Sequence, residues 1–124
     1  MPRIIEITKE FRFDAAHCLP KMGDGHPYTR LHGHSFRVEV TLSGALDPEL
    51  GWVTDFAELD RQLGVIRTEL DHHTLNDIPG LEHPTLETIC SWIFGRVQAL
   101  YPGLSAVTIH RDSIGERCVI RKGK

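Results

Sequence analysis

The fold of this chain is decided by residues 31–44, which read LHGHSFRVEVTLSG. Apolar and polar residues alternate through this stretch, as they do in a strand that has one buried face. Because successive side chains of a strand point to opposite faces, both histidines lie on the apolar side. That side carries His32, His34, Phe36, Val38, Val40 and Leu42. The stretch therefore predicts a strand over 33–43 with two imidazoles at its start.

A second alternating run precedes the first. Residues 3–17 predict a long strand, with a bulge near Lys9, and one face of it carries Phe11, Phe13, Ala15 and His17. The connection over 19–31 predicts a loop, because it contains Pro20, Gly23, Gly25 and Pro27. The two strands then form a hairpin-like pair that directs three imidazoles toward one place.

The histidines at 17, 32 and 34 form a candidate metal site. Neutral imidazole is a borderline-soft ligand that suits zinc. Three protein ligands with an open fourth position are typical of a catalytic rather than a structural site, because the open position admits water or substrate. Two other interpretations stay open: hydrogen-bonded polar residues at a sheet edge, or a pair exposed in a loop.

The middle of the chain predicts two amphipathic helices. The first runs over 56–70, and Asp55 with Glu58 resembles a capping box at its start. Its apolar stripe is Phe56, Leu59, Leu63, Ile66 and Leu70. After a loop over 71–84, a second helix begins at Thr85 and is closed by Pro102-Gly103. Its apolar stripe is Leu86, Ile89, Ile93, Val97 and Leu100.

The C-terminal region alternates again, over 106–111 and 117–121, and predicts a terminal hairpin. The element order is therefore ββααββ, an α+β fold with a four-stranded antiparallel sheet and two helices on one face. The sequence has no internal repeat, and we interpret residues 1–124 as a single domain. The uncovered face and the sheet edges favour self-association.

The composition argues against several classes of partner. The net charge is −3, the pI is near 6.2 and the Lys and Arg residues are scattered, so we expect no nucleic-acid partner. No apolar stretch reaches membrane-spanning length and no secretion signal is evident, so we expect no membrane association. Cys18, Cys90 and Cys118 lack metal-type spacing and fit a reducing compartment. We therefore expect a soluble cytoplasmic protein.

Four motifs give the chain a resemblance to a known family. They are Phe13-Asp14-Ala15-Ala16-His17, Leu31-His32-Gly33-His34-Ser35, Gly51-Trp52-Val53-Thr54-Asp55-Phe56 and, over 70–82, LDHHTLNDIPGLE. In this order they resemble the 6-pyruvoyltetrahydropterin synthase family, and within it the bacterial 6-carboxytetrahydropterin synthases of queuosine biosynthesis. The resemblance extends along nearly the whole chain.

This resemblance implies a tunnelling fold (T-fold), usually a homohexamer built as a dimer of trimers, with active sites at subunit interfaces. It implies Zn²⁺ on His17, His32 and His34, and 7,8-dihydroneopterin triphosphate as the substrate. In the family's reaction a cysteine and an Asp-His pair move protons as triphosphate leaves. The queuosine branch also releases acetaldehyde.

Asp71 and His72 match the family's proton relay in position. A carboxylate beside an imidazole fixes its tautomer and raises its basicity, as a proton shuttle near neutral pH requires. His73 is a second, less favoured candidate for the relay. The alternative is that Asp71 ends the helix while both histidines are solvated loop residues.

Tyr28 is the first departure from the family pattern, since it stands where the family has its catalytic cysteine. Thr29 stands where a variant branch has a glutamate. Tyrosine has an ordinary pKa of about 10, so Tyr28 needs a nearby cation or the metal to act as a base. Cys18 points across the strand from His17, and we interpret it as a core or edge thiol.

Arg111 is the second departure, because the family carries there a glutamate that accepts hydrogen bonds from the pterin. Arginine can only donate hydrogen bonds. Asp112 can replace the carboxylate if a bulge shifts the strand by one residue, and Glu116 can replace it by folding back from the turn. Otherwise the pocket prefers an anionic or carbonyl-rich ligand, or Arg111 pairs with a carboxylate of another subunit.

These residues favour a zinc-dependent lyase of the 6-pyruvoyl- or 6-carboxytetrahydropterin synthase type. The hypothesis assigns catalysis to His72, Asp71 and Tyr28, and substrate binding to Arg111, Asp112 and Glu116. The alternative is a zinc-binding paralogue that binds a different small heterocycle, with altered or no synthase activity. A purely structural zinc site is least favoured, because three ligands leave the metal open.

Overall fold

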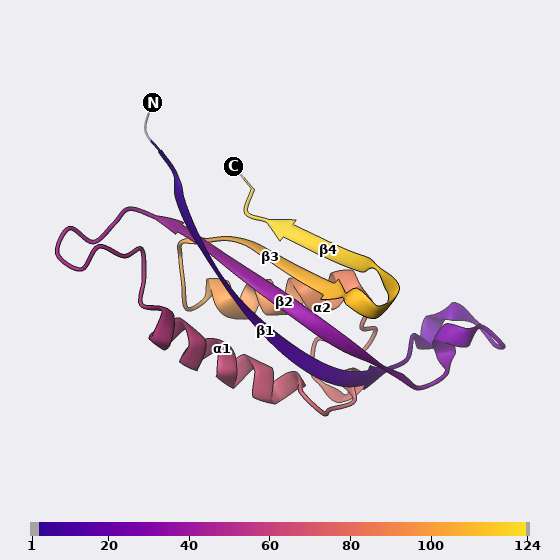
Figure 1. Cartoon of the computed structure of the whole chain (residues 1–124). Coiled ribbons are helices and arrows are strands. Elements are labelled where there is room, and N and C mark those ends of the chain that lie inside the picture. Colours follow the sequence, from indigo (N-terminus) through magenta and orange to yellow (C-terminus); the bar gives the residue numbers. More distant parts are fainter. Residues whose placement is uncertain (1–2, 124) are drawn as a thin grey trace.

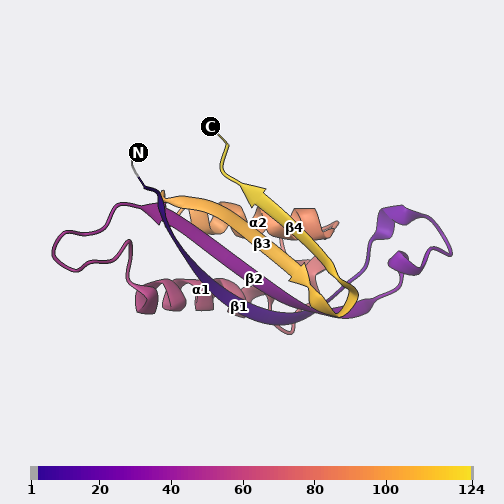
Figure 2. The same ribbon diagram turned by 45° about the horizontal axis from the view of Figure 1, so that its top comes forward.

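The computed structural model describes residues 3–123 as two layers, a four-stranded antiparallel sheet with two helices on one of its faces (Figures 1 and 2). The strands follow the order β1-β2-β3-β4 across the sheet and comprise Ile5–His17 (β1), His32–Gly44 (β2), Leu104–Arg111 (β3) and Glu116–Arg121 (β4). The helices are α1 (Phe56–Leu70) and α2 (Leu86–Gln98). The predicted order ββααββ and the α+β class are confirmed.

Strands β1 and β2 pair without interruption from Ile5–Gly44 to His17–His32. The predicted bulge near Lys9 is therefore wrong: the two strands have thirteen residues each, so no extra residue has to be accommodated. The irregularity of the sheet lies instead in the β2–β3 pairing, between Thr41 and Leu42. Unbroken pairing keeps the alternation of faces in phase up to the histidines.

The core lies between the inner face of the sheet and the two helices. Side chains from the sheet and from both helices are buried there, including Phe13, Phe36, Val38, Val40, Leu59, Leu63, Ile66, Ile89, Ile93, Val107 and Ile109. Two predicted members of the helix stripes are not buried, since Phe56 is 48% and Leu100 47% exposed. Phe56 is the first residue of α1 and Leu100 follows the end of α2, so both lie past the buried part of their helix.

Both helices begin at a side-chain cap. The Asp55 carboxylate accepts a hydrogen bond from the Ala57 backbone N–H, and the Thr85 hydroxyl accepts one from the Thr88 N–H. Glu58 does not complete a capping box, because its carboxylate accepts hydrogen bonds from Arg61 and Gln62 instead. The predicted helix over 56–70 is confirmed.

The segment after α1 returns to the free edge of β1. The Ala16 N–H donates to the His73 carbonyl at 3.1 Å, and the His72 N–H donates to the Asp14 carbonyl at 2.6 Å. A parallel bridge joins Ala16 to Thr74. This segment therefore covers the C-terminal part of the β1 edge and fixes the position of Asp71 and His72.

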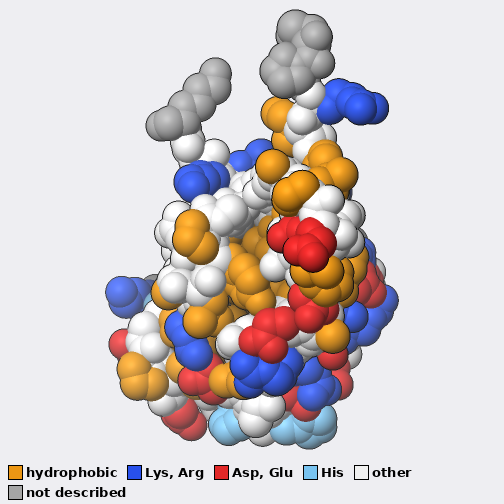
Figure 3. All heavy atoms as spheres, turned by 90° about the vertical axis from the view of Figure 1, so that its left-hand side faces the viewer, with side chains coloured by type: hydrophobic (Ala, Val, Ile, Leu, Met, Phe, Trp, Pro, Cys, Tyr) orange, Lys and Arg blue, Asp and Glu red, His pale blue; other side chains and the backbone are white. Residues whose placement is uncertain are grey.

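The outer face of the sheet is polar and no helix covers it within residues 3–123 (Figure 2). Exposed hydrophobic side chains gather instead, among charged ones, at the end that carries the β2–α1 connection (Figure 3). They include Leu46, Leu50, Trp52 and Phe56. Among the described residues, no helix is both long enough and apolar enough to cross a membrane.

Leu63 tests how α1 contributes to the core. It is buried on the inner face of the helix, so Leu63→Ala is expected to lower the free energy of unfolding by about 2–5 kcal/mol. Val65 is 52% exposed on the same helix, and Val65→Ala is expected to change it by less than about 0.5 kcal/mol. Urea unfolding at one fixed protein concentration measures both. Equal losses would show that α1 does not pack as described.

Candidate metal centre

Three imidazoles meet where β1 ends and β2 begins. His17 lies directly opposite His32 in the strand pairing, and His34 lies opposite Ala15, one step along the same face. One ring nitrogen from each of the three histidines lies within 4.8 Å of the others. The ring centroids are 4.6 to 5.0 Å apart. The prediction that alternation brings the three side chains to one point is confirmed.

Backbone carbonyls fix which nitrogen of two of the rings, those of His17 and His32, faces the cluster. His17 Nδ1 lies 2.8 Å from the Pro84 carbonyl oxygen, and His32 Nδ1 lies 2.7 Å from that of Arg30. A carbonyl only accepts, so Nδ1 carries the proton in both rings and Nε2 presents its lone pair. His34 Nε2 is buried and has no hydrogen-bond partner. A divalent ion would satisfy this buried atom, and carbonyl-anchored imidazoles are typical of metal sites.

The surroundings favour the neutral form of two of the three imidazoles, those of His17 and His34. Burial lowers the pKa of His34 to about 4, and the positive charge of Arg111 acts in the same direction. Burial also lowers the pKa of His17. Because a metal binds the deprotonated imidazole, the lowered pKa of these two rings favours metal binding at neutral pH. The donor set and its protonation therefore fit a divalent metal ion.

A cavity of about 690 Å³ opens in front of the triad. Its lining includes His17, His32, His34, Tyr28, Arg111 and Glu116. The Arg111 side chain is only 16% exposed, and its Nη2 lies 2.8 Å from Glu116 Oε1. Glu116 reaches the cavity as the first residue of β4, directly across from Arg111. The cavity thus combines a candidate metal site with a partly buried cation and a carboxylate.

Tyr28 lies at the rim of this cavity and is 49% exposed. It belongs to a short 3₁₀ turn, Pro27–Thr29, and its ring lies 4.5 Å from that of His26. Cys18 is not among the residues that line the cavity. Its backbone N–H and carbonyl are both bound by the Asn76 side chain.

Asp112 lies outside the cavity, although its neighbour Arg111 lies inside. Its carboxylate is on the outer face of the sheet, where it accepts two hydrogen bonds from Arg37, at 2.8 and 3.1 Å. The alternation from Val107 to Arg111 is unbroken, so consecutive residues keep opposite faces. The bulge that would have brought Asp112 inside does not occur, and Glu116 is the carboxylate that faces the cavity.

Asp71 and His72 form a hydrogen-bonded pair, with Asp71 Oδ2 2.9 Å from His72 Nδ1. The Asp14 backbone N–H donates to the other oxygen at 2.9 Å and, with His72 and Arg67, lowers the pKa of Asp71. His72 has φ of 59°, the only positive φ at a non-glycine among residues 3–123. Such a backbone conformation is uncommon and is often found where a side chain has to be presented in one direction.

The Asp71–His72 pair does not line the cavity of the triad within one chain. His72 is 78% exposed and lines a second hollow of about 570 Å³, together with His34, Ser35 and Ser113. His73 lines the same hollow, and its Nδ1 lies 2.8 Å from the Asp71 carbonyl oxygen. His34 is therefore the residue that the two hollows share.

Three lining residues at the start of α2 were not expected from the sequence. Thr85, Leu86 and Glu87 border the cavity of the triad because the loop over 71–84 delivers the helix N-terminus there. Thr85 was identified only as a helix start. The sequence contains no periodic or spacing signal that places Glu87 near the histidines.

The fold and the triad together define a class: a T-fold protein with a three-histidine candidate metal site. The family model described as 6-pyruvoyl tetrahydropterin synthase matches residues 6–122 of the chain. The chain therefore belongs to the 6-pyruvoyl tetrahydropterin synthase family, as the resemblance implied.

Individual relatives support this membership. The chain is 44% identical over 109 residues to a 6-carboxy-5,6,7,8-tetrahydropterin synthase of Synechocystis sp., with 83% of each chain covered. It is 38% identical over 91 residues to a dihydroneopterin monophosphate aldolase of Pyrococcus furiosus, with 73% of each covered. Its fold matches the 6-pyruvoyl tetrahydropterin synthase of Caenorhabditis elegans with a TM-score of 0.87 at 24% identity, covering 98% and 97% of the two chains.

Metal analysis tests the triad. After equilibration with a zinc salt and dialysis, the wild-type chain is expected to retain one ion, and His32→Ala and His34→Ala are expected to lose it, because two imidazoles remain. His73→Ala is the matched control, since His73 lies outside the triad, and it should retain the ion. Unchanged metal content in both triad variants would exclude this site.

Proposed function

We propose that this chain is a zinc-dependent lyase of the 6-pyruvoyl- or 6-carboxytetrahydropterin synthase type that acts on 7,8-dihydroneopterin triphosphate or a close analogue. The observation that carries the proposal is that the triad and the Arg111–Glu116 pair line the same cavity. The names of the Synechocystis and Pyrococcus relatives support a pterin as the substrate.

His17, His32 and His34 would hold the metal ion through the lone pairs that face the cluster. A bound Zn²⁺ supplies a Lewis acid that polarises substrate oxygens. Three protein ligands leave a position for those oxygens. The carbonyls of Pro84 and Arg30 keep two of the rings oriented, so the chain itself sets the direction from which a substrate can approach.

Glu116 and Arg111 would recognise the pterin ring. The edge of a pterin carries an amino group and a ring N–H, which donate, beside a carbonyl, which accepts. A carboxylate accepts from such donors, and a guanidinium donates to such a carbonyl. The ion pair already places one acceptor and one donor group side by side in the cavity, at 2.8 Å. This pair thus supplies a carboxylate although the family's glutamate position holds an arginine.

Asp71 and His72 would move the protons. An ionised Asp71 accepts a hydrogen bond from His72 Nδ1–H and so fixes the tautomer of His72, leaving Nε2 to exchange a proton with the substrate. Because His72 is exposed and lines the second hollow, we propose that it serves a site completed by assembly of several chains, as in the expected homohexamer. The outer edge of β4 carries no partner strand within the described residues, which also favours assembly through strand edges.

A second candidate is a paralogue that cleaves or binds a different substrate. Tyr28 favours it, because its phenol stands at the rim of the cavity where the family has a cysteine. An aldolase, the activity named for the Pyrococcus relative, breaks a carbon–carbon bond and leaves phosphate esters intact. The two candidates therefore differ in whether inorganic triphosphate is released.

Product analysis separates the candidates. The zinc-loaded chain incubated with 7,8-dihydroneopterin triphosphate is expected to release triphosphate and acetaldehyde, and the metal-free chain is the control. Release of an aldehyde without triphosphate would support an aldolase instead. Absence of any product above the control would contradict the lyase and support a paralogue that binds another heterocycle.

The relay is tested by Asp71→Asn and His72→Gln. Each is expected to lower kcat about 10²–10⁴-fold, because a general acid–base group contributes about that factor. Zinc content should be unchanged, since neither residue belongs to the triad. His73→Gln is the matched comparison and should cost less than His72→Gln. A larger loss in His73→Gln would assign the relay to His73.

A further inference from the structure

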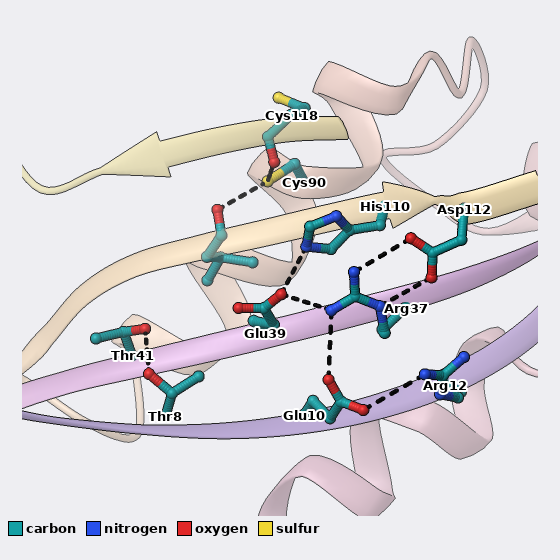
Figure 4. Close-up of polar contacts among 11 residues, drawn as sticks. Thr8, Glu10, Arg12, Arg37, Glu39, Thr41, Cys90, His110, Asp112 and Cys118 are labelled. Carbon is teal, nitrogen blue, oxygen red and sulfur yellow. Dashed lines mark hydrogen bonds and ion pairs between the residues drawn. The ribbon is translucent and has the colours of Figure 1, made fainter. Parts of the chain in front are cut away.

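Arg37 and Asp112 contact each other on the outer face of the sheet (Figure 4). We propose that they form a clamp that positions the Arg111–Glu116 pair in the cavity. Arg37 and Asp112 are thereby positioning residues for ligand binding. The inference rests on the proposed function in one respect, since it takes a pterin as the ligand that the pair recognises.

The β3–β4 turn joins the two cavity residues, and its own residues are not buried. Strand β3 ends at Arg111, a 3₁₀ turn spans Asp112–Ile114, and β4 begins at Glu116. None of the residues in the 3₁₀ turn is buried. Gly115 closes the turn with φ of 68°, and its N–H donates to the Asp112 carbonyl. Hydrophobic packing therefore does not fix the place of this turn.

Arg37 provides the missing attachment from the neighbouring strand β2. Its Nε donates to Asp112 Oδ2 at 2.8 Å and its Nη2 donates to Oδ1 at 3.1 Å. Two parallel bonds between a guanidinium and a carboxylate fix orientation as well as distance. Within residues 3–123, no other side chain forms a hydrogen bond with the side chain of Asp112, Ser113 or Ile114.

Arg37 is itself held by carboxylates on the same face. Its Nη1 lies 2.6 Å from Glu39 Oε1 and 3.4 Å from Glu10 Oε2, and Glu39 Oε1 also contacts His110 Nε2 at 2.7 Å (Figure 4). The Arg37 side chain is only 22% exposed. An ion pair with several partners and limited solvent contact holds its geometry better than an isolated surface pair.

The clamp acts across the sheet. Asp112 follows Arg111 directly, and the two side chains point to opposite faces, so holding the Asp112 carboxylate fixes the backbone from which Arg111 projects inward. The metal ligands lie on β1 and β2 and not on this turn. Release of the clamp should therefore affect the ligand and leave the metal in place.

Ligand titration tests the clamp in the full zinc-loaded chain, with unsubstituted pterin as the probe and its fluorescence as the signal. Arg37→Lys loses the two-pronged contact and Asp112→Asn loses the charge, so each is expected to raise the Kd about five- to tenfold. Zinc content should stay at the wild-type value. Glu10→Gln is the matched control: it alters a contact of the same guanidinium but not the turn, and should change the Kd by less than about twofold.

Coupling to Glu116 distinguishes positioning from a general structural effect. In a Glu116→Gln background, Arg37→Lys should add little further loss, because the residue that it positions is already disabled. An equal fold-loss in both backgrounds would overturn the proposal. So would an unchanged Kd in Arg37→Lys and Asp112→Asn, or loss of zinc in either.

Amide hydrogen exchange gives a readout that needs no ligand. Exchange over 111–116 should be faster in Arg37→Lys than in wild type, while exchange around the triad stays the same. Unchanged exchange in the turn would overturn the clamp. If the wild-type chain does not bind pterin at all, the proposed function fails, and this exchange measurement alone decides the clamp.

Discussion

The unbroken pairing of β1 with β2 is the constraint on which the rest of the structure depends. Every residue from Ile5 to His17 has a partner on β2, ending with His17 opposite His32. A slip of one residue would move the apolar set of one strand to the polar face. It would also separate the imidazoles, because His17 and the pair on β2 would then point in opposite directions. Burial of Phe13 and Phe36 thus fixes the register that brings the triad together.

The alternation of faces also gives the two sides of the sheet different contents. The inner face carries the core and then, at one end, the triad and Arg111. The outer face carries Arg37, Glu39 and Asp112 in one polar network (Figure 4). Neighbouring residues point to different faces of the sheet. A contact made by an outer side chain therefore restrains the backbone from which the next, inner side chain projects. In the proposed clamp, this network of ion pairs supports the site without touching it.

The sequence predicted the elements whose signal is periodic. The helix over 56–70 and the shared face of the three histidines followed from spacing alone, because period and burial agree in these segments. Burial at the helix ends was less predictable: Phe56 and Leu100 fit the stripe but are exposed. Periodicity reports the direction of a side chain, not whether a partner stands opposite.

The cavity was less predictable than the fold, for a physical reason. Whether Asp112 or Glu116 faced inward depended on a possible bulge in β3, and no local pattern around Ser113 decides that. The Arg37–Asp112 contact joins residues 75 positions apart, and so does not appear as a motif. The second hollow also depends on a contact between residues far apart in the sequence, since β1 holds the backbone of the 71–74 segment.

Charge balance explains why Arg111 and Glu116 occur together beside the triad. A guanidinium close to a divalent ion repels it, and Arg111 already lowers the pKa of His34 in the chain by the same repulsion. A carboxylate 2.8 Å from the guanidinium reduces that repulsion without occupying a position on the metal. An arginine alone at this place would weaken the metal site. Paired with Glu116 it can stay in the cavity, because the ion pair as a whole carries no net charge.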